Sequence, residues 1–229
     1  MADAKITAVE KITFAAVLLI TIIAFAFFFL NPSYVDIYLG EDGIIEWLTV
    51  AGLFLGFVVC ANRFIKLLKQ RNWWFLTVVF VLGLLLFIAA GEEISWGQRI
   101  FGIESSEYFI KNNAQGETNI QNLVVNGVKI NKLVFSTILI SVLGIYLVVL
   151  PLLYRYNNSV KDFVDRSGIA VPRVYHIISF LILFAISGLL KHDRNPELLE
   201  CGAAALFFLI IYNPVNVGIF QSSKDRITI

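Results

Sequence analysis

The chain has 229 residues, 58% of them hydrophobic, and its mean hydropathy is +0.79. These values lie far outside the usual range of soluble domains, so the sequence predicts an integral membrane protein. The formal net charge is +1 at pH 7, and the basic residues form no stripe that could neutralise phosphates, which argues against nucleic acid as a partner.

Six apolar segments are long enough to cross a membrane as helices, which takes about 17–25 residues. They cover approximately residues 11–31, 44–68, 73–93, 132–153, 174–190 and 198–217. The first segment has no small-residue cleavage site, which favours a retained helix over a cleaved signal peptide. The sequence therefore predicts an all-α bundle of about six transmembrane helices, forming a single domain over residues 1–229.

The basic residues predict the orientation of this bundle, because Lys and Arg concentrate in cytoplasmic connections. Twelve of the eighteen lie in the two tails and in segments 62–72 and 154–173, whereas six lie in the other connections. Twelve of the seventeen acidic residues fall on the opposite side. We therefore expect both termini to be cytoplasmic, an acidic outer face, and contact between segment 154–173 and anionic lipid.

The motif GEEISWGQRIFG lies at the end of the third apolar segment and begins with two adjacent carboxylates, Glu92 and Glu93. Charged groups at membrane depth cost on the order of 2.5–3.5 kcal/mol each and are usually paired or functional. If the helix continues through the motif, Glu92, Trp96 and Arg99 share one face and Arg99 pairs with Glu92. Gly102 would then cap the helix in the left-handed conformation. The alternative is an interfacial anchor without a site.

Two further acidic segments adjoin the same predicted outer boundary. In EDGIIEW, at the start of the second span, helix capping explains Asp42 better than it explains Glu46. In NPELLE, at the start of the sixth span, capping explains Glu197 better than Glu200. A second acid about one turn into a helix points towards hydrocarbon or towards the bundle interior. We therefore predict that Glu46 and Glu200 approach the glutamate pair of the third span.

The connection over residues 94–131 is the one large polar loop of the chain and is expected to be periplasmic. Residues 105–111 predict a short interfacial helix, and Asn126-Gly127 predicts a hairpin turn, so we expect a folded lid over the acidic boundary. The amide side chains between them either turn the backbone or orient a substrate or carboxylates. The candidate binding residues in this connection are Trp96, Gln98, Arg99, Gln115, Glu117, Asn119 and Asn122.

The cysteines and histidines of the chain form no obvious metal or disulfide pattern. Cys60 and Cys201 each lie inside an apolar run and are interpreted as small core residues. His176, at the start of the fifth span, is interpreted as an interfacial side chain on the basic side. His192, on the outer side, is either a solvated loop residue or a ligand or base that joins the glutamates.

The GEEISWGQRIFG motif and the pattern QxExNxxNL over residues 115–123 resemble a family of uncharacterised bacterial polytopic membrane proteins. The resemblance covers residues 40–130 and implies a bacterial inner-membrane protein, but it implies no activity. Members often carry His at the position of Gln121, so this chain lacks a metal ligand that the family pattern would offer in the loop.

The CAAX-type intramembrane proteases also carry a Glu-Glu pair on a membrane helix, followed by an Arg and by two histidines on later helices. In this chain Arg99 lies further along than the arginine of those proteases. His176 is also predicted at the opposite boundary. These two departures argue against membership of that family.

Three classes of function are considered for the acidic outer face. A proton- or cation-coupled carrier is disfavoured, because the inner halves of the spans contain no ionisable relay and the sequence has no obvious inverted repeat. The other two classes are a binding subunit and an enzyme. In the first, a carboxylate and amide site binds a protein partner, a lipid or a cation, and the chain is a non-catalytic binding or assembly subunit. In the second, the chain is a membrane-embedded enzyme that acts on a lipid or lipid-linked substrate at the outer leaflet. Glu92 or Glu93 would then serve as general base or as ligand of a divalent cation. Because no nucleophile, metal triad or cofactor motif is visible, the first class is preferred.

Overall fold

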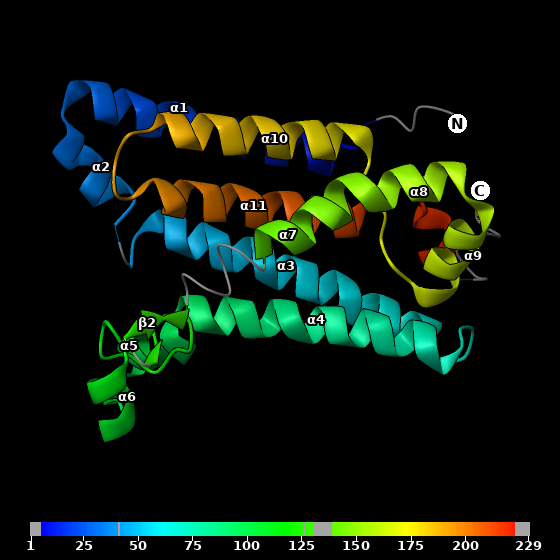
Figure 1. Cartoon of the computed structure of the whole chain (residues 1–229), viewed down its shortest axis with the longest axis horizontal. Helices are drawn as coiled ribbons and strands as arrows, with labels where there is room; N and C mark the ends of the chain where they lie inside the picture. The colour runs from blue at the N-terminus through cyan, green and yellow to red at the C-terminus, as the bar shows by residue number, and fades with distance from the viewer. Residues whose placement is uncertain (1–5, 41, 126, 131–138, 223–229) are drawn as a thin grey trace.

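The computed structural model describes residues 6–40, 42–125, 127–130 and 139–222. Its long helices lie lengthwise side by side, and a small folded segment projects from one end of the bundle (Figure 1). The helices are α1 (Ala8–Leu30), α2 (Pro32–Tyr38), α3 (Ile44–Leu67), α4 (Trp73–Glu93), η1 (Ser95–Gly97), α5 (Gln98–Phe101), α6 (Glu107–Asn112), α7 (Leu139–Gly144), η3 (Ile145–Val149), α8 (Leu150–Tyr156), α9 (Asn158–Ser167), α10 (Val174–Leu189), α11 (Asn195–Tyr212) and η4 (Val217–Phe220).

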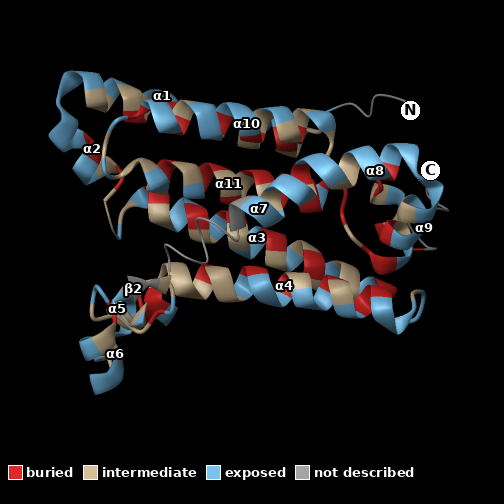
Figure 2. Ribbon diagram, in the orientation of Figure 1, coloured by how far each residue is buried: buried red, intermediate tan, exposed pale blue. Residues whose placement is uncertain are grey.

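Four of the described helices, α1, α3, α4 and α11, are long and apolar enough to cross a membrane. Two shorter apolar helices cover Ser141–Tyr156 and Val174–Leu189. Exposed residues follow the outward faces of α1 and α4, and many are large and apolar, such as Leu18 and Leu85 (Figure 2). Apolar faces of this extent are what a lipid environment requires. The chain is an all-α membrane protein.

The ends of the long helices have local causes. α1 begins at Ala8, because the Thr7 hydroxyl accepts a hydrogen bond from the backbone N–H of Glu10 and the Glu10 carboxylate accepts one from that of Thr7. α11 ends at Tyr212, not at residue 217 as predicted, because Pro214 disfavours the helical conformation of the residue before it. The first part of the predicted fourth span, residues 132–138, lies outside the described residues.

The core of the bundle forms around α11, which packs against α3, α10 and α1, while α3 also packs against α4. Glycines allow these helices to approach closely, as in many membrane proteins. A side chain at Gly52 would come within 3.1 Å of the Ala204 backbone, and one at Gly83 would come within 3.0 Å of Cys60. Cys60 and Cys201 are both free and buried, in agreement with their interpretation as core residues.

The two ends of the bundle differ in charge. The start of α3, the end of α4 and the start of α11 lie at the same end, so the three acidic segments meet there as expected (Figure 1). We call this the acidic end. The start of α1, the α8 and α9 helices and the end of α11 lie at the opposite end, which we call the basic end (Figure 1).

The segment between α4 and α7 projects from the acidic end. It contains α5, α6 and a small antiparallel hairpin of β1 (Val124–Val125) and β2 (Val128–Lys129), in which Val125 is paired with Val128. An isolated bridge between Asn113 and Leu123 closes the amide-rich stretch into a compact loop. We call residues 113–123 the amide loop.

Candidate functional site

The helix of the third span, α4, ends at Glu93 inside the GEEISWGQRIFG motif, as its predicted bounds of 73–93 require, and does not continue through the motif. Ser95, Trp96 and Gly97 have φ values of +46°, +56° and +74°. This left-handed region is sterically unfavourable for residues other than glycine. The chain therefore turns sharply after Glu93 and begins a new helix, α5, at Gln98. Gly102 does adopt a left-handed conformation, with φ of +63°, but it caps α5.

Packing of the Trp96 ring supports this turn. The ring lies against Gly91, where an added side chain would come within 2.9 Å of it. The indole N–H donates a 2.7 Å hydrogen bond to the Glu92 carboxylate. Small size at Gly91 and a carboxylate at Glu92 thus hold Trp96 in a conformation that a tryptophan seldom adopts.

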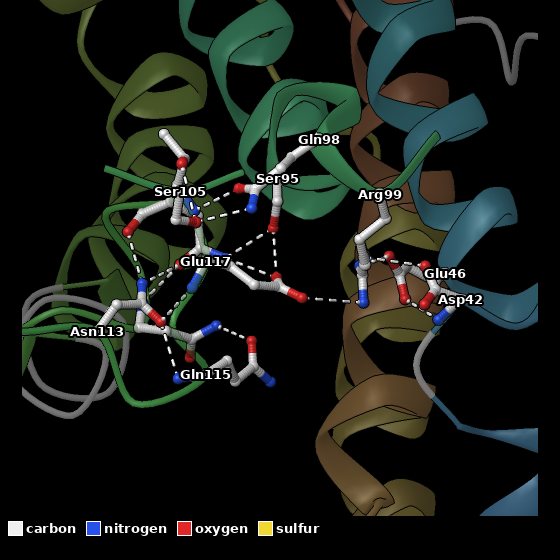
Figure 3. Close-up of polar contacts among 12 residues, drawn as sticks. Asp42, Glu46, Ser95, Gln98, Arg99, Ser105, Asn113, Gln115 and Glu117 are labelled. Carbon is white, nitrogen blue, oxygen red and sulfur yellow. Dashed lines mark hydrogen bonds and ion pairs between the residues drawn. The ribbon is translucent and has the colours of Figure 1, made fainter. Parts of the chain in front are cut away.

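The turn directs Arg99 away from Glu92, so the Arg99–Glu92 pair, which required a helix continuing through the motif, is not formed. The Arg99 guanidinium instead contacts Asp42 at 3.0 Å, Glu46 at 2.9 Å and Glu117 at 3.4 Å (Figure 3). One cation therefore joins the start of α3 to the amide loop. The Glu46 and Glu117 side chains are only 11% and 16% exposed, so these two pairs are weakly screened by water compared with the 61% exposed Asp42.

Buried amides hold Glu117 in place. The Ser95 hydroxyl and the Asn119 side chain both donate to the Glu117 carboxylate, and Asn119 also donates to Ser95 at 2.9 Å. Asn113 donates to the Asn119 side chain and backbone, each at 2.9 Å. The amides therefore turn the loop and orient a carboxylate at the same time.

Gln98 connects α5 to the same loop. Its side-chain oxygen accepts from the backbone N–H of Thr118 at 2.8 Å, and its amide donates to Ser105 at 2.7 Å. The other two candidates of the loop contact each other: the Asn122 side chain donates to that of Gln115 at 2.6 Å in an exposed pair. Their backbone N–H groups donate to the side chains of Asn113 and Asn119, which join both residues to the same network.

Glu92 and Glu93 have different surroundings. Glu92 accepts hydrogen bonds from the Trp96 indole and from the backbone N–H groups of Ile120 and Gln121, so its carboxylate fastens the amide loop to the end of α4. Glu93 is half-buried and is hydrogen-bonded to the side chain of Gln121. Of the pair, Glu92 is therefore the carboxylate that anchors the amide loop.

Three acids of α3 and α11 lie at the same end of the bundle as Glu93: Glu46 near the start of α3, and Glu197 and Glu200 near the start of α11 (Figure 1). Glu200 is exposed, and among the described residues neither it nor Glu93 forms an ion pair with a basic side chain. Carboxylates gathered at a low-dielectric boundary repel each other unless a proton or cation neutralises them.

The remaining predicted ligands do not join this cluster. His192 lies 3.6 Å from Asp36 of α2, not beside the glutamates. Within the described part of the chain, no group of three or more His, Cys, Asp and Glu side chains is arranged to hold a metal ion. The three carboxylates that do converge, those of Asp42, Glu46 and Glu117, surround the Arg99 guanidinium.

The structure also contains a buried polar cluster at the basic end that the sequence analysis missed. Glu10 and His176 have fully buried side chains, and Glu10 accepts hydrogen bonds from Tyr175 at 2.6 Å and from Asn213 at 3.1 and 3.0 Å. The nearest atoms of Glu10 and His176 are 3.1 Å apart. The interpretation of His176 as an interfacial side chain is wrong, because α1 and the end of α11 cover it.

Local sequence signals could have found only part of this cluster. The Thr7-x-x-Glu10 spacing is a capping-box signal, which explains the carboxylate without any long-range partner. Nothing in the sequence indicates that Asn213, more than 200 residues away, would complete its hydrogen bonds.

Comparisons of the chain with protein-family models, with curated proteins and with solved structures found no match. The resemblance of residues 40–130 to a family therefore stays a prediction, and function is argued from the site alone.

Proposed function

We propose that this chain is a bacterial inner-membrane protein of six transmembrane helices with both termini in the cytoplasm. Four helices of sufficient length, two shorter apolar helices and the separation of acidic from basic segments support this arrangement. Reporter fusions after residue 229 and within residues 103–110 test it. A periplasmic signal from the C-terminal fusion would contradict the topology.

We further propose that the chain is a non-catalytic binding or assembly subunit. Its acidic end binds a positively charged group of a ligand. Its ligand is a cationic lipid headgroup, a basic segment of a protein partner or a divalent cation. Glu93 and Glu200 are the binding carboxylates. The Arg99 contacts and the Glu92 anchor hold the adjoining amide loop in position beside them.

One arrangement carries this proposal: the end of α4 with Glu93 and the start of α11 with Glu200 lie at the same end of the bundle, and neither glutamate has a basic partner among the described residues. The arginine nearest in the motif, Arg99, is already surrounded by three other carboxylates. A bound cation would relieve the repulsion between the two glutamates, and this relief would favour binding.

Thermal unfolding of the purified protein tests the proposal, because a ligand that binds only the folded state raises the melting temperature. Mg²⁺, Ca²⁺, a lysine-rich peptide and ethanolamine-headgroup lipid are added separately. We expect at least one to stabilise the wild type, and expect Glu93→Gln and Glu200→Gln to abolish that shift. Glu107→Gln is the matched control, because its side chain is 93% exposed on α6. Equal shifts in all four proteins would contradict the proposal.

The strained turn supports a second candidate function, a membrane enzyme that uses Glu93 as general base. Backbone strain at Ser95 and Trp96, two and three residues after the carboxylate, is a feature that clusters at active sites. In this case, the Glu93→Gln variant should lose turnover of an outer-leaflet lipid in reconstituted vesicles while still binding it. Loss of binding together with turnover would favour the non-catalytic function.

A further inference from the structure

A cavity at the basic end, far from the glutamates, has the features of a second ligand site. It lies between α9 and the N-terminal end of α4 and has a volume of ≈ 490 Å³. This volume falls within the range of about 300–1,000 Å³ that is typical of small-molecule sites. The residues that line it are Asn72, Trp74, Ser159, Asp162, Phe163, Arg166 and Ser167.

Two of the lining residues carry opposite charges that the protein does not pair. Asp162 and Arg166 are four residues apart on α9, a spacing at which an acid and a base on a helix can form an ion pair. No such pair is formed, and neither side chain has a hydrogen bond or ion pair to another described residue. Both charges therefore remain available to a ligand in the cavity.

Aromatic side chains form the apolar part of the wall. Trp74 and Phe163 are 58% and 59% exposed. The indole N–H of Trp74 donates a 2.9 Å hydrogen bond to Ser167, which fixes the ring against α9. Because Trp74 stands in the first turn of an apolar helix long enough to span, the cavity opens at the depth where tryptophan meets the lipid headgroups.

We infer that this cavity binds the headgroup of a zwitterionic phospholipid that carries a primary ammonium group. Arg166 contacts the phosphate, for which a guanidinium has matching donors. Asp162 accepts hydrogen bonds from the ammonium group, and Trp74 and Phe163 contact the glycerol and the first carbons of the acyl chains. The amide NH₂ of Asn72, whose side-chain oxygen already accepts from Phe75, adds a donor for the phosphate.

The unpaired acid distinguishes this inference from simple attraction of the basic end to anionic lipid. A site for an anionic headgroup gains nothing from Asp162 and is weakened by its charge. A quaternary ammonium has no N–H to donate, so a choline headgroup would also leave the Asp162 carboxylate without a hydrogen bond. A phosphoethanolamine headgroup satisfies both Arg166 and Asp162.

Native mass spectrometry of the delipidated full-length protein measures the affinity for ethanolamine, glycerol and choline phospholipids with identical chains. We expect the wild type to bind the ethanolamine lipid about tenfold more tightly than either of the others. Arg166→Gln should weaken binding of the ethanolamine lipid about tenfold. Asp162→Asn should invert the preference in favour of the anionic glycerol headgroup, because only the cation then remains.

Lys161→Gln is the matched control for Arg166→Gln, because Lys161 is the exposed base next to Asp162 and does not line the cavity. Circular dichroism verifies that each variant is folded. The preference of the wild type among the three lipids tests the inference even if a variant fails to fold. A wild type that prefers the anionic or the choline lipid would overturn the inference. So would an Asp162→Asn variant with the wild-type preference, or soluble phosphoethanolamine that binds as tightly as the lipid.

Discussion

Two polar clusters occupy opposite ends of the bundle, and they differ in how far their charged side chains are buried. At the basic end, the Glu10 and His176 side chains are completely buried and Glu10 accepts hydrogen bonds from three other residues. At the acidic end, Arg99 is 26% exposed and bridges carboxylates whose exposure ranges from 11% to 61%. The first cluster is closed to water and ligands, whereas the second adjoins carboxylates that have no basic partner in the described structure.

The difference separates a structural cluster from a candidate site. A buried carboxylate is tolerated only when its hydrogen bonds are complete, as those of Glu10 are. Such a cluster joins helices permanently, in this case α1, α10 and α11. The Arg99 network joins the bundle to a loop through partly exposed pairs, which cost less to break. Ligand-dependent change is therefore expected at the acidic end.

Removal of the buried carboxylate should have the largest effect on stability. In Glu10→Ala the buried His176 and Asn213 and the half-buried Tyr175 lose the carboxylate to which they are hydrogen-bonded. We expect a loss of about 3–5 kcal/mol in the free energy of unfolding, measured by denaturant titration in detergent micelles. Glu107→Ala on α6 is the control and should change stability by less than about 0.5 kcal/mol. A small loss in Glu10→Ala would mean that the closed cluster does not hold the helices together.

Removal of the amide that orients Glu117 should have an intermediate effect. Asn119 is 1% exposed and hydrogen-bonds to Ser95, Glu117 and Asn113. We expect Asn119→Ala to cost about 1–3 kcal/mol, most of it confined to the amide loop. Hydrogen exchange of residues 113–123 measures this local loss. Unchanged protection in the loop would show that its fold does not depend on the buried amide.

Removal of the bridging cation should have a smaller effect. Arg99→Gln removes the ion pairs of Arg99 with Glu46 and Glu117, but Glu46 still accepts from the backbone N–H of Asp42, and Glu117 from Ser95 and Asn119. We expect a cost of about 1–2 kcal/mol and faster hydrogen exchange in the amide loop than in α3. Lys111→Gln, in which an exposed helical pair at 3.9 Å is lost, should leave exchange unchanged. Equal effects of the two substitutions on hydrogen exchange would show that the Arg99 ion pairs stabilise the loop no more than an ordinary surface pair does.

The smallest effect is expected in the exposed part of the amide loop. Gln115→Ala removes the exposed hydrogen bond that Asn122 donates to Gln115, which water can replace. Its effect on stability should stay below about 0.5 kcal/mol, and binding of any ligand at Glu93 should stay at the wild-type level. A thermal-unfolding titration with the ligand that stabilises the wild type measures both. A marked loss of affinity would extend the site to Gln115.

The sequence by itself determined the membrane class, the positions of most long helices and the gathering of three acidic segments at one end. These depend on apolar length and charge placement, which are local properties of the chain. It also indicated Gly102 as a left-handed cap, since glycine adopts that conformation at little cost. Glu46 and Glu200 could likewise be selected as candidates, because each lies about one turn into a helix that begins at the acidic end.

Only the tertiary structure decided which charges meet. Helical periodicity would place Arg99 beside Glu92. The left-handed turn at Ser95–Gly97 instead directs Arg99 to Glu46, and Glu92 accepts hydrogen bonds from the amide loop. That turn depends on packing of Trp96 against Gly91, which no local propensity for Ser or Trp predicts. The Glu10 cluster likewise requires Asn213 from the far end of the chain. The packing of the helices decides which distant charges form pairs. The sequence alone shows only which charged residues are available.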